Sequence, residues 1–561
     1  RVFSKEAFNE AANRPAWKAV QPLLYGCLKS LLHIMGELRE RELLGFVLQR
    51  LDGFVPLLVP FPTLAKGYLK ALVALWGDFG LSTKSSSKHR RGRDGDSDDD
   101  DGGDGGKAKE EVAAQAAERV RLLAYVRVKQ LAVAMPFPTV ETCMRELYLA
   151  FARRARQPPT DPLVRGSMAL MQRCVVDLFG VDIASAYQNA FQYIRQLALM
   201  LRKAVHQNAG STAKAPAKVK AKAKAKTSEA LQAMRRWQVV NCLRLWSAVL
   251  SAYPGEDQLL MLVYPLAQVI EGVVSLCTTL RHSPLLFHLC RMRHRLAAAS
   301  SAYVPCSSAL LKVLRSPALF KQVRKSTATP PDLRRLLRLG EKEAKEAGAQ
   351  SAVVTEALRL LQQEFDMYRY SPGFPEACLR ALAGLRKFAK AVKVSKWRMQ
   401  ARGVVDALER QGTWAARRRA ELGLSPLDVT DLEQLKPEGE RSMRERVAVS
   451  EAKAEWMEGG EDLDAAGLPL APKPLPPKKK AKDASHTTTT TTTNKDSDTD
   501  DSEDEDEDED EDSEEEMEQD SDSDAAPAAQ AASAAGRPGG VSVPAGSRPG
   551  RGGKVTGRKG G

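Results

Sequence analysis

Apolar residues recur at three- and four-residue steps through long parts of the chain. The series Leu64, Tyr68, Leu72 and Trp76 is one example. This spacing places the apolar side chains on one face of an amphipathic helix. We find no sustained two-residue alternation of the kind that predicts strands, and prolines separate many of the apolar runs. The pattern therefore predicts many short helices, each with one face to bury.

The segment 186–204 carries an aromatic version of this pattern. We expect its buried face to contain Tyr187, Phe191, Ile194, Leu197 or Ala198, and Leu201. We expect the opposite face to contain Gln188, Gln192, Arg195 and Arg202, with Leu199 among them. The polar face offers hydrogen-bonding groups to a partner, whereas core packing is the ordinary role of the aromatic residues.

Composition divides the chain into ordered blocks and low-complexity segments. We predict N-terminal helical repeats at 1–80, a disordered charged insert at 81–110, helical repeats at 111–207, a Lys/Ala linker at 208–227, C-terminal helical repeats at 228–460 and a disordered tail at 461–561.

Short amphipathic helices are not stable singly, but stacking them in pairs buries their apolar faces. The predicted fold class is therefore all-α, a HEAT-like or armadillo-like α-solenoid of stacked helix pairs with disordered inserts and a long disordered C-terminal tail. We see no repeat of fixed length, and a compact helical bundle is the alternative.

Charge changes the picture further, because the net charge of +13 hides a division within the chain. Residues 496–524 hold 21 acidic residues and no Lys or Arg, which leaves 84 basic against 50 acidic residues elsewhere, a net charge of +34. A body this basic predicts contact with polyanions such as RNA. The tail also contains a lysine cluster after several prolines, which we interpret as a nuclear import signal or a solubilising patch. Its members are Lys478, Lys479, Lys480 and Lys482.

The sequence contains no persuasive signature of an enzyme or of a metal site. The chain has no GxxxxGK[ST], HExxH or GxSxG motif, and its eight cysteines form no CxxC pair. The best metal candidates are His282, His288, Cys290 and His294, of which only Cys290 and His294 share a helical face. Because arginines crowd this region and their charge opposes a cation, we expect no metal site. Because the enzyme motifs are missing, we also expect no cofactor or catalytic site. We also see no apolar window of about 18 residues and expect no membrane contact.

Several strings, in order, resemble the nucleolar complex protein 2 family. The segment AYQNAFQYIRQLALMLRKA at 186–204 is similar to the family's YQ-x-x-F-x-YIRQLA helix. Trp237 and Trp246 fall in a segment like W-Q-F-V-x-C-L-x-L-W, and Tyr264 and Gln268 in one like L-I-Y-P-L-x-Q-V-I-x-G. Pro284 to His288, Tyr303 to Pro305 and Phe374 to Lys390 continue the likeness, although Leu286 stands where the family tends to have Arg.

The resemblance implies a scaffold for maturation of the large (60S) ribosomal subunit precursor in the nucleolus and nucleoplasm. It implies a heterodimer with nucleolar complex protein 1 or nucleolar complex protein 3 homologues, contact with precursor rRNA and ribosomal proteins, and no catalysis or cofactor. A histone-binding chromatin regulator that uses the acidic tail is the alternative. As candidates for a partner or RNA interface we select Tyr187, Gln188, Gln192, Arg195, Gln196, Arg202, Trp237, Trp246, Tyr264 and Gln268.

Overall fold

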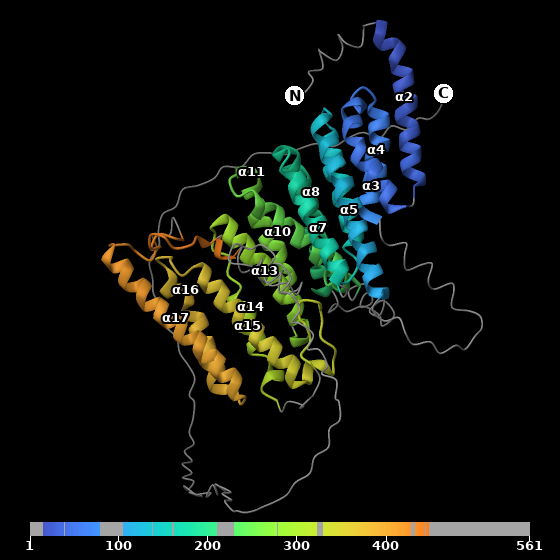
Figure 1. Cartoon of the computed structure of the whole chain (residues 1–561). Helices are drawn as coiled ribbons and strands as arrows, with labels where there is room; N and C mark the ends of the chain where they lie inside the picture. The colour runs from blue at the N-terminus through green and yellow to red at the C-terminus, as the bar shows by residue number, and fades with distance from the viewer. Residues whose placement is uncertain are drawn as a thin grey trace, which may run out of the picture. The chain divides into compact units, whose positions relative to one another are not determined.

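A computed structural model of the chain describes most of residues 15–447 (Figure 1). The described residues are 15–38, 40–78, 105–136, 138–159, 162–209, 229–277, 279–321, 329–427, 432–443 and 445–447. Within these ranges the secondary structure is helical and contains no strand, as predicted.

The first group of helices precedes residue 135. Its elements are α2 (Pro15–Glu37), α3 (Arg41–Arg50), the 3-10 helix η1 (Leu51–Leu58), α4 (Pro62–Asp78) and α5 (Gly105–Ala134). The predicted apolar face of α4 is confirmed, because Tyr68 and Trp76 are fully buried. The Tyr68 hydroxyl also donates a 2.6 Å hydrogen bond to the Leu28 carbonyl of α2. Helix α5 begins at Gly105, ahead of the predicted block boundary at 111.

The middle group surrounds a cluster of aromatic side chains. Its elements are α6 (Thr139–Arg154), α7 (Pro162–Phe179), α8 (Ile183–Ala209), α10 (Trp237–Ala252), α11 (Asp257–Leu260) and α12 (Val263–Ser275). Trp246 of α10 lies at the centre, with its ring 5.1 Å from Tyr148, 5.5 Å from Phe179 and 6.0 Å from Tyr193 between centroids. Four helices therefore meet on one indole.

The last group continues the helical pattern to residue 421. Its elements are η3 (Leu280–His282), α13 (Ser283–Ser300), α14 (Ser307–Leu314), η4 (Pro317–Leu319), η5 (Glu343–Lys345), α15 (Ala347–Met367), α16 (Phe374–Ala391) and α17 (Ser395–Glu421). Between η4 and η5, residues 329–342 are mostly turns and irregular backbone. Leu339 of this segment donates its N–H to the Arg281 carbonyl at 2.8 Å.

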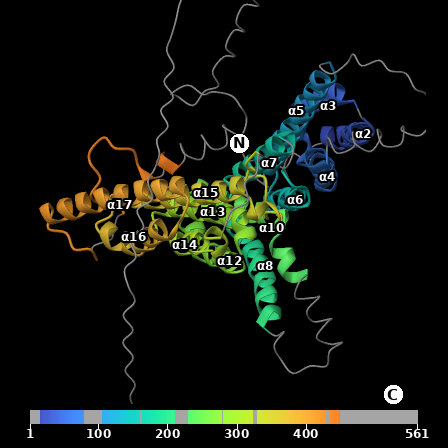
Figure 2. The same cartoon turned by 90° about the horizontal axis from the view of Figure 1, so that it is seen from below.

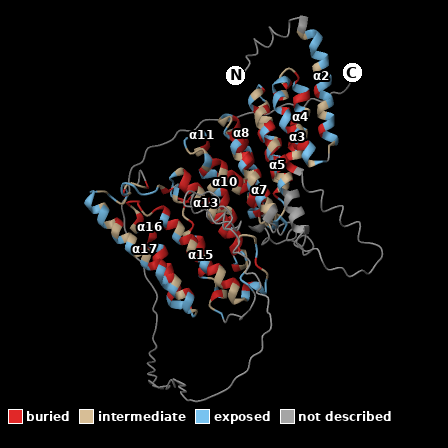
Figure 3. Ribbon diagram, viewed as in Figure 1, coloured by how far each residue is buried: buried red, intermediate tan, exposed pale blue. Residues whose placement is uncertain are grey.

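Contacts between helices run mainly among elements that are near one another along the chain. Helix α4 packs against α5 and α6, α10 against α6, α7, α12 and α13, and α15 against α13, α14 and α17 (Figures 1 and 2). Buried residues line the faces where these helices meet, and exposed residues lie on the opposite faces (Figure 3). Amphipathic helices are thus stabilised by their neighbours.

One described stretch, Asp257–Ser275, is long and apolar enough to cross a membrane by length and composition. The expectation that no such window exists is therefore wrong on that criterion. The stretch contains α11 and α12, and its Leu266, Ile270 and Val273 side chains are fully buried against the other helices. Core helices pass the same test, so its apolar character is accounted for by packing.

A tight contact between the end of α7 and the end of α10 leads to a stability prediction. Tyr253 donates its hydroxyl to the Val176 carbonyl at 2.7 Å, and its Cζ would lie 2.6 Å from a Cβ at Gly180. We expect Gly180→Ala to displace the ring and lower the free energy of unfolding by about 1–3 kcal/mol. Denaturant unfolding followed by circular dichroism measures this.

The matched control is Gly166→Ala on α7, where a Cβ would meet no atom within 4 Å. Because Gly166 is exposed in a helix, alanine there should be neutral or stabilise by up to about 1 kcal/mol. Equal effects at Gly180 and Gly166 would contradict the proposed steric cause.

Candidate interaction surface

Helix α8 buries only part of the predicted face. Ala186, Ala190, Tyr193 and Leu197 are at most 6% exposed, whereas Phe191 is 48% exposed. The prediction that Phe191 belongs to the buried stripe is therefore wrong. The reason is tertiary: α8 packs against α6, α7, α10, α11 and α12, and Tyr193 is drawn into the aromatic cluster, 3.9 Å from Tyr148 between centroids.

The outward side of α8 combines amide, arginine and apolar side chains at helical spacing. We define the α8 outer face as the exposed residues Gln188, Phe191, Gln192, Arg195, Gln196, Leu199 and Arg202. The expectation that the four predicted polar residues and Leu199 share an exposed side is confirmed. Tyr187 is half-buried and stacks on Phe191 with centroids 6.2 Å apart.

The charge of α8 is of one sign. Residues 183–209 contain Arg195, Arg202 and Lys203 and no Asp or Glu. Leu199 is 53% exposed between Arg195 and Arg202, and Phe191, which is 48% exposed, lies one turn before these cations. Aromatic side chains and arginines are the residue types enriched where proteins meet partners. The α8 outer face can therefore bind an acidic partner surface that also offers apolar contacts.

The other predicted interface residues lie in different surroundings. Trp246 is fully buried, so it is a core residue and not part of a surface. Trp237 is half-buried and lies edge-on to His288, with centroids 5.4 Å apart. Tyr264 is 72% exposed and Gln268 is exposed on α12, the helix that packs against α8. These last two residues remain available to a partner.

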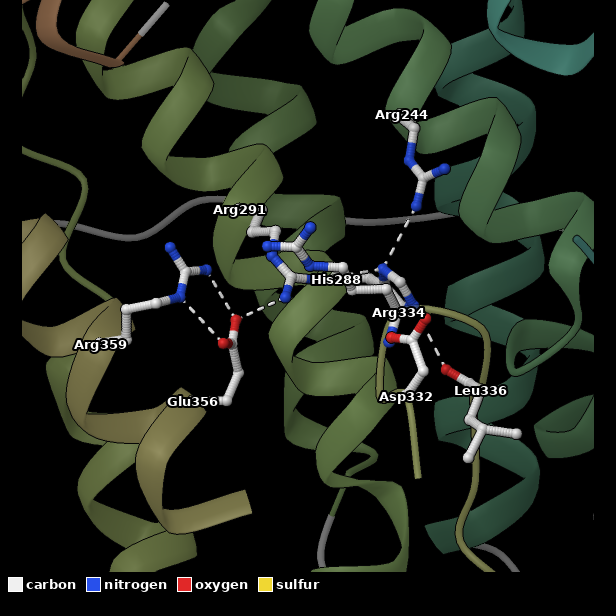
Figure 4. Close-up of polar contacts among 8 residues, drawn as sticks. All are labelled: Arg244, His288, Arg291, Asp332, Arg334, Leu336, Glu356 and Arg359. Carbon is white, nitrogen blue, oxygen red and sulfur yellow. Dashed lines mark hydrogen bonds and ion pairs between the residues drawn. The ribbon is translucent and has the colours of Figure 1, made fainter. Parts of the chain in front are cut away.

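A polar network that the sequence did not predict joins α10, α13, α15 and the irregular segment 329–342 (Figure 4). Arg291 of α13 and Arg359 of α15 both donate hydrogen bonds to the Glu356 carboxylate. Arg359 does so twice, at 2.9 and 2.7 Å. Although burial opposes ionisation, Arg359 and Arg291 hold the pKa of Glu356 below its usual range. The Arg291–Glu356 ion pair therefore ties α13 to α15, and Arg359 holds the carboxylate from within α15.

His288 forms the other half of the network. Its Nδ1 lies 3.2 Å from Arg244 Nη2 and 3.5 Å from Arg291 Nη1, and its Nε2 lies 3.2 Å from the Leu336 carbonyl (Figure 4). Since arginine can only donate, Nδ1 accepts and Nε2 carries the proton. Burial and the two arginines lower the pKa of His288 well below its usual value. The imidazole is thus neutral and holds segment 329–342 against α13.

Of the four residues considered for a metal, His282 and His288 have separate surroundings. His282 Nδ1 lies 2.8 Å from Thr279 Oγ1, and His288 belongs to the arginine network. Cys290 and His294 are fully buried on α13. The predicted import lysines Lys478, Lys479, Lys480 and Lys482 lie outside the described residues.

A model of the Noc2p family matches residues 138–445, which include α6 to α17 and the whole network around His288. The chain therefore belongs to the Noc2p family, and the resemblance seen in the sequence is confirmed.

The chain is similar to several curated relatives. It is 26% identical to the nucleolar complex-associated protein 2 of Arabidopsis thaliana over 76% of this chain and 48% of the relative. It is 23% identical to the nucleolar complex protein 2 of Drosophila melanogaster over 79% of this chain and 50% of the relative. Protein REBELOTE of Arabidopsis thaliana is 21% identical over 76% and 61%. The chain spans about half the length of the first two relatives.

Proposed function

We propose that the protein is a non-catalytic ribosome biogenesis factor of the nucleolus and nucleoplasm. It acts as a scaffold in maturation and intranuclear transport of the large (60S) subunit precursor. Family membership supports this, since the relatives are named as nucleolar complex proteins rather than as enzymes. Its helices form a HEAT-like solenoid that offers extended surface to a complex.

The observation that carries the proposal is the α8 outer face, where Phe191 and Leu199 are exposed beside arginines. Exposed apolar groups lose contact with water when a partner covers them, and arginine binds carboxylate or phosphate by paired hydrogen bonds. This surface binds a helical partner, a homologue of nucleolar complex protein 1 or nucleolar complex protein 3. Other basic residues contact precursor rRNA in a salt-sensitive, sequence-tolerant way.

Affinity purification with RNA crosslinking tests the assignment to this pathway. Large-subunit precursor RNA and assembly factors should be recovered with the full chain, and binding should weaken as salt rises. Recovery of histones without precursor RNA would replace the scaffold by the chromatin-regulator alternative. Deleting 496–524 should leave precursor association intact, because that association is assigned to the helical body.

Charge reversal on α8 tests the surface itself. We expect Arg195→Glu with Arg202→Glu to reduce recovery of the partner at least tenfold, since two favourable charge contacts become repulsive. Pull-down with quantitative mass spectrometry measures this, and circular dichroism checks that the helices are retained.

The matched control is Arg402→Glu with Arg410→Glu on α17, two exposed arginines at similar spacing. This pair makes the same change in net charge and should leave partner recovery unchanged. Equal losses in both double variants would assign the effect to net charge and remove the role of the α8 outer face.

A further inference from the structure

Three potential ligands for a metal ion converge inside the helical body. His294 lies on α13, Cys306 directly precedes α14, and Glu364 lies on α15. One ring nitrogen, the sulfur and one carboxylate oxygen all lie within 4.8 Å of one another. The three residues are fully buried. They are 12 and 58 positions apart along the chain, so the fold alone brings them together.

The polar atoms that face this point lack hydrogen-bond partners. Neither ring nitrogen of His294 has one, and neither does Oε2 of Glu364. His294 Nε2 and Glu364 Oε2 lie 3.9 Å apart, which is longer than a hydrogen bond. Leaving a buried polar atom unpaired costs about 1–3 kcal/mol, and more for a charged group. Only one ring nitrogen of His294 can face Glu364 Oε2, and an ion bound between these two atoms would compensate both.

The neighbouring contacts hold the carboxylate and the thiol in place. The backbone N–H of Cys306 donates a 3.0 Å hydrogen bond to Glu364 Oε1, which leaves Oε2 directed elsewhere. The Cys306 thiol lies 3.9 Å from the Cys290 carbonyl and also interacts with the Cys290 side chain. Cys290 precedes His294 by four residues, so both side chains lie on one face of α13. Cys290 is thus adjacent to Cys306, although its sulfur is not among the three atoms that lie within 4.8 Å of one another. A shift of its side chain toward them would complete four ligands.

The ligand types select the ion. Thiolate, imidazole and carboxylate together suit Zn²⁺, whereas Ca²⁺ and Mg²⁺ prefer oxygen ligands alone. Zinc bonds of about 2.0–2.3 Å in a tetrahedron place ligand atoms roughly 3.3–3.8 Å apart. The Nε2–Oε2 separation of 3.9 Å is close to this range. The Cys306 thiolate and the Glu364 carboxylate neutralise the two positive charges of the ion, and a Cys290 thiolate would leave the site with one net negative charge.

We propose that His294, Cys306 and Glu364, with Cys290 as the fourth ligand, form a structural zinc site that joins α13, α14 and α15. A closed site of four protein ligands without access for water is the arrangement of structural rather than catalytic zinc. The ion would fix the start of α14 against two longer helices. It adds a metal-dependent source of stability to a body otherwise held by packing.

The experiment uses the full chain, tag-free, purified from zinc-supplemented medium without chelator. Inductively coupled plasma and native mass spectrometry should find about one zinc per chain, and a strong chelator should lower the Tm by several degrees. Cobalt substitution should give the absorption of a thiolate–Co²⁺ bond. A chain that carries no zinc, shows no such band and keeps its Tm with chelator would overturn the proposal and leave a buried His294–Glu364 ion pair.

Variants locate the site. His294→Asn and Cys306→Ser should lose the bound zinc, and the matched control Cys174→Ser, at a buried cysteine on α7, should keep it. If a ligand variant fails to fold, the cobalt spectrum of the unmodified chain still decides whether a thiolate binds metal. Zinc retained by both ligand variants would overturn the assignment to these residues.

Discussion

Replacing Trp246 with alanine is expected to lower the free energy of unfolding by about 3–5 kcal/mol. The indole is fully buried and contacts aromatic rings from α6, α7 and α8. Its removal would leave a cavity at the point where four helices meet, and the rigid rings around it cannot close the space. A loss of this size is a large share of the stability of an ordinary domain.

Thermal and denaturant unfolding measure the effect, and Phe191→Ala provides the control. Phe191 is 48% exposed, so its loss should cost less than about 1 kcal/mol. We expect Phe191→Ala to weaken partner binding instead. Similar destabilisation by the two variants would show that the indole is not the centre of the packing.

Glu356→Ala is expected to have the second largest effect, a loss of about 3 kcal/mol. The carboxylate is 16% exposed and Arg291 is 22% exposed, so the variant would leave a largely buried guanidinium without its anion. Burial already lowers the pKa of Arg291, while Glu356 acts in the opposite direction. Removing one partner of a buried pair costs more than the pair itself contributes.

The control is Glu409→Ala, which breaks the pair between Arg386 and Glu409 across α16 and α17. These side chains are 58% and 41% exposed, and exposed pairs contribute at most about 1 kcal/mol. Chemical denaturation at low and high salt separates the two cases, since only the exposed pair should respond to screening. Equal losses in both variants would contradict the buried character assigned to Glu356.

The helical class and the family could be predicted from the sequence, because both depend on patterns local to a segment. The α4 face that contains Tyr68 and Trp76 is an example, since its buried residues follow the simple helical period. Helix α8 departs from this rule because five helices contact it. Its buried face includes Tyr193, whereas Phe191, which was predicted to be buried, is exposed.

The polar sites depend on long-range contacts and so could not be read from spacing. Glu356 meets Arg291 across 65 positions, and the Cys306 N–H meets Glu364 across 58. Among the residues of the proposed zinc site, only Cys290 and His294 could be singled out from the sequence, because a separation of four residues places them on one face of a helix. The other two proposed ligands are Cys306, directly before α14, and Glu364 on α15. A lone Cys or Glu has no sequence pattern that would distinguish it as a ligand.

The neighbour-to-neighbour packing of α2 to α17 has a consequence for biosynthesis. Each helix finds its contacts mainly among segments made shortly before or after it. Loops that close between such segments are short and cost little entropy, so native contacts can form while the rest of the chain is still being translated. The chain can therefore bury its apolar faces progressively while it is being synthesised.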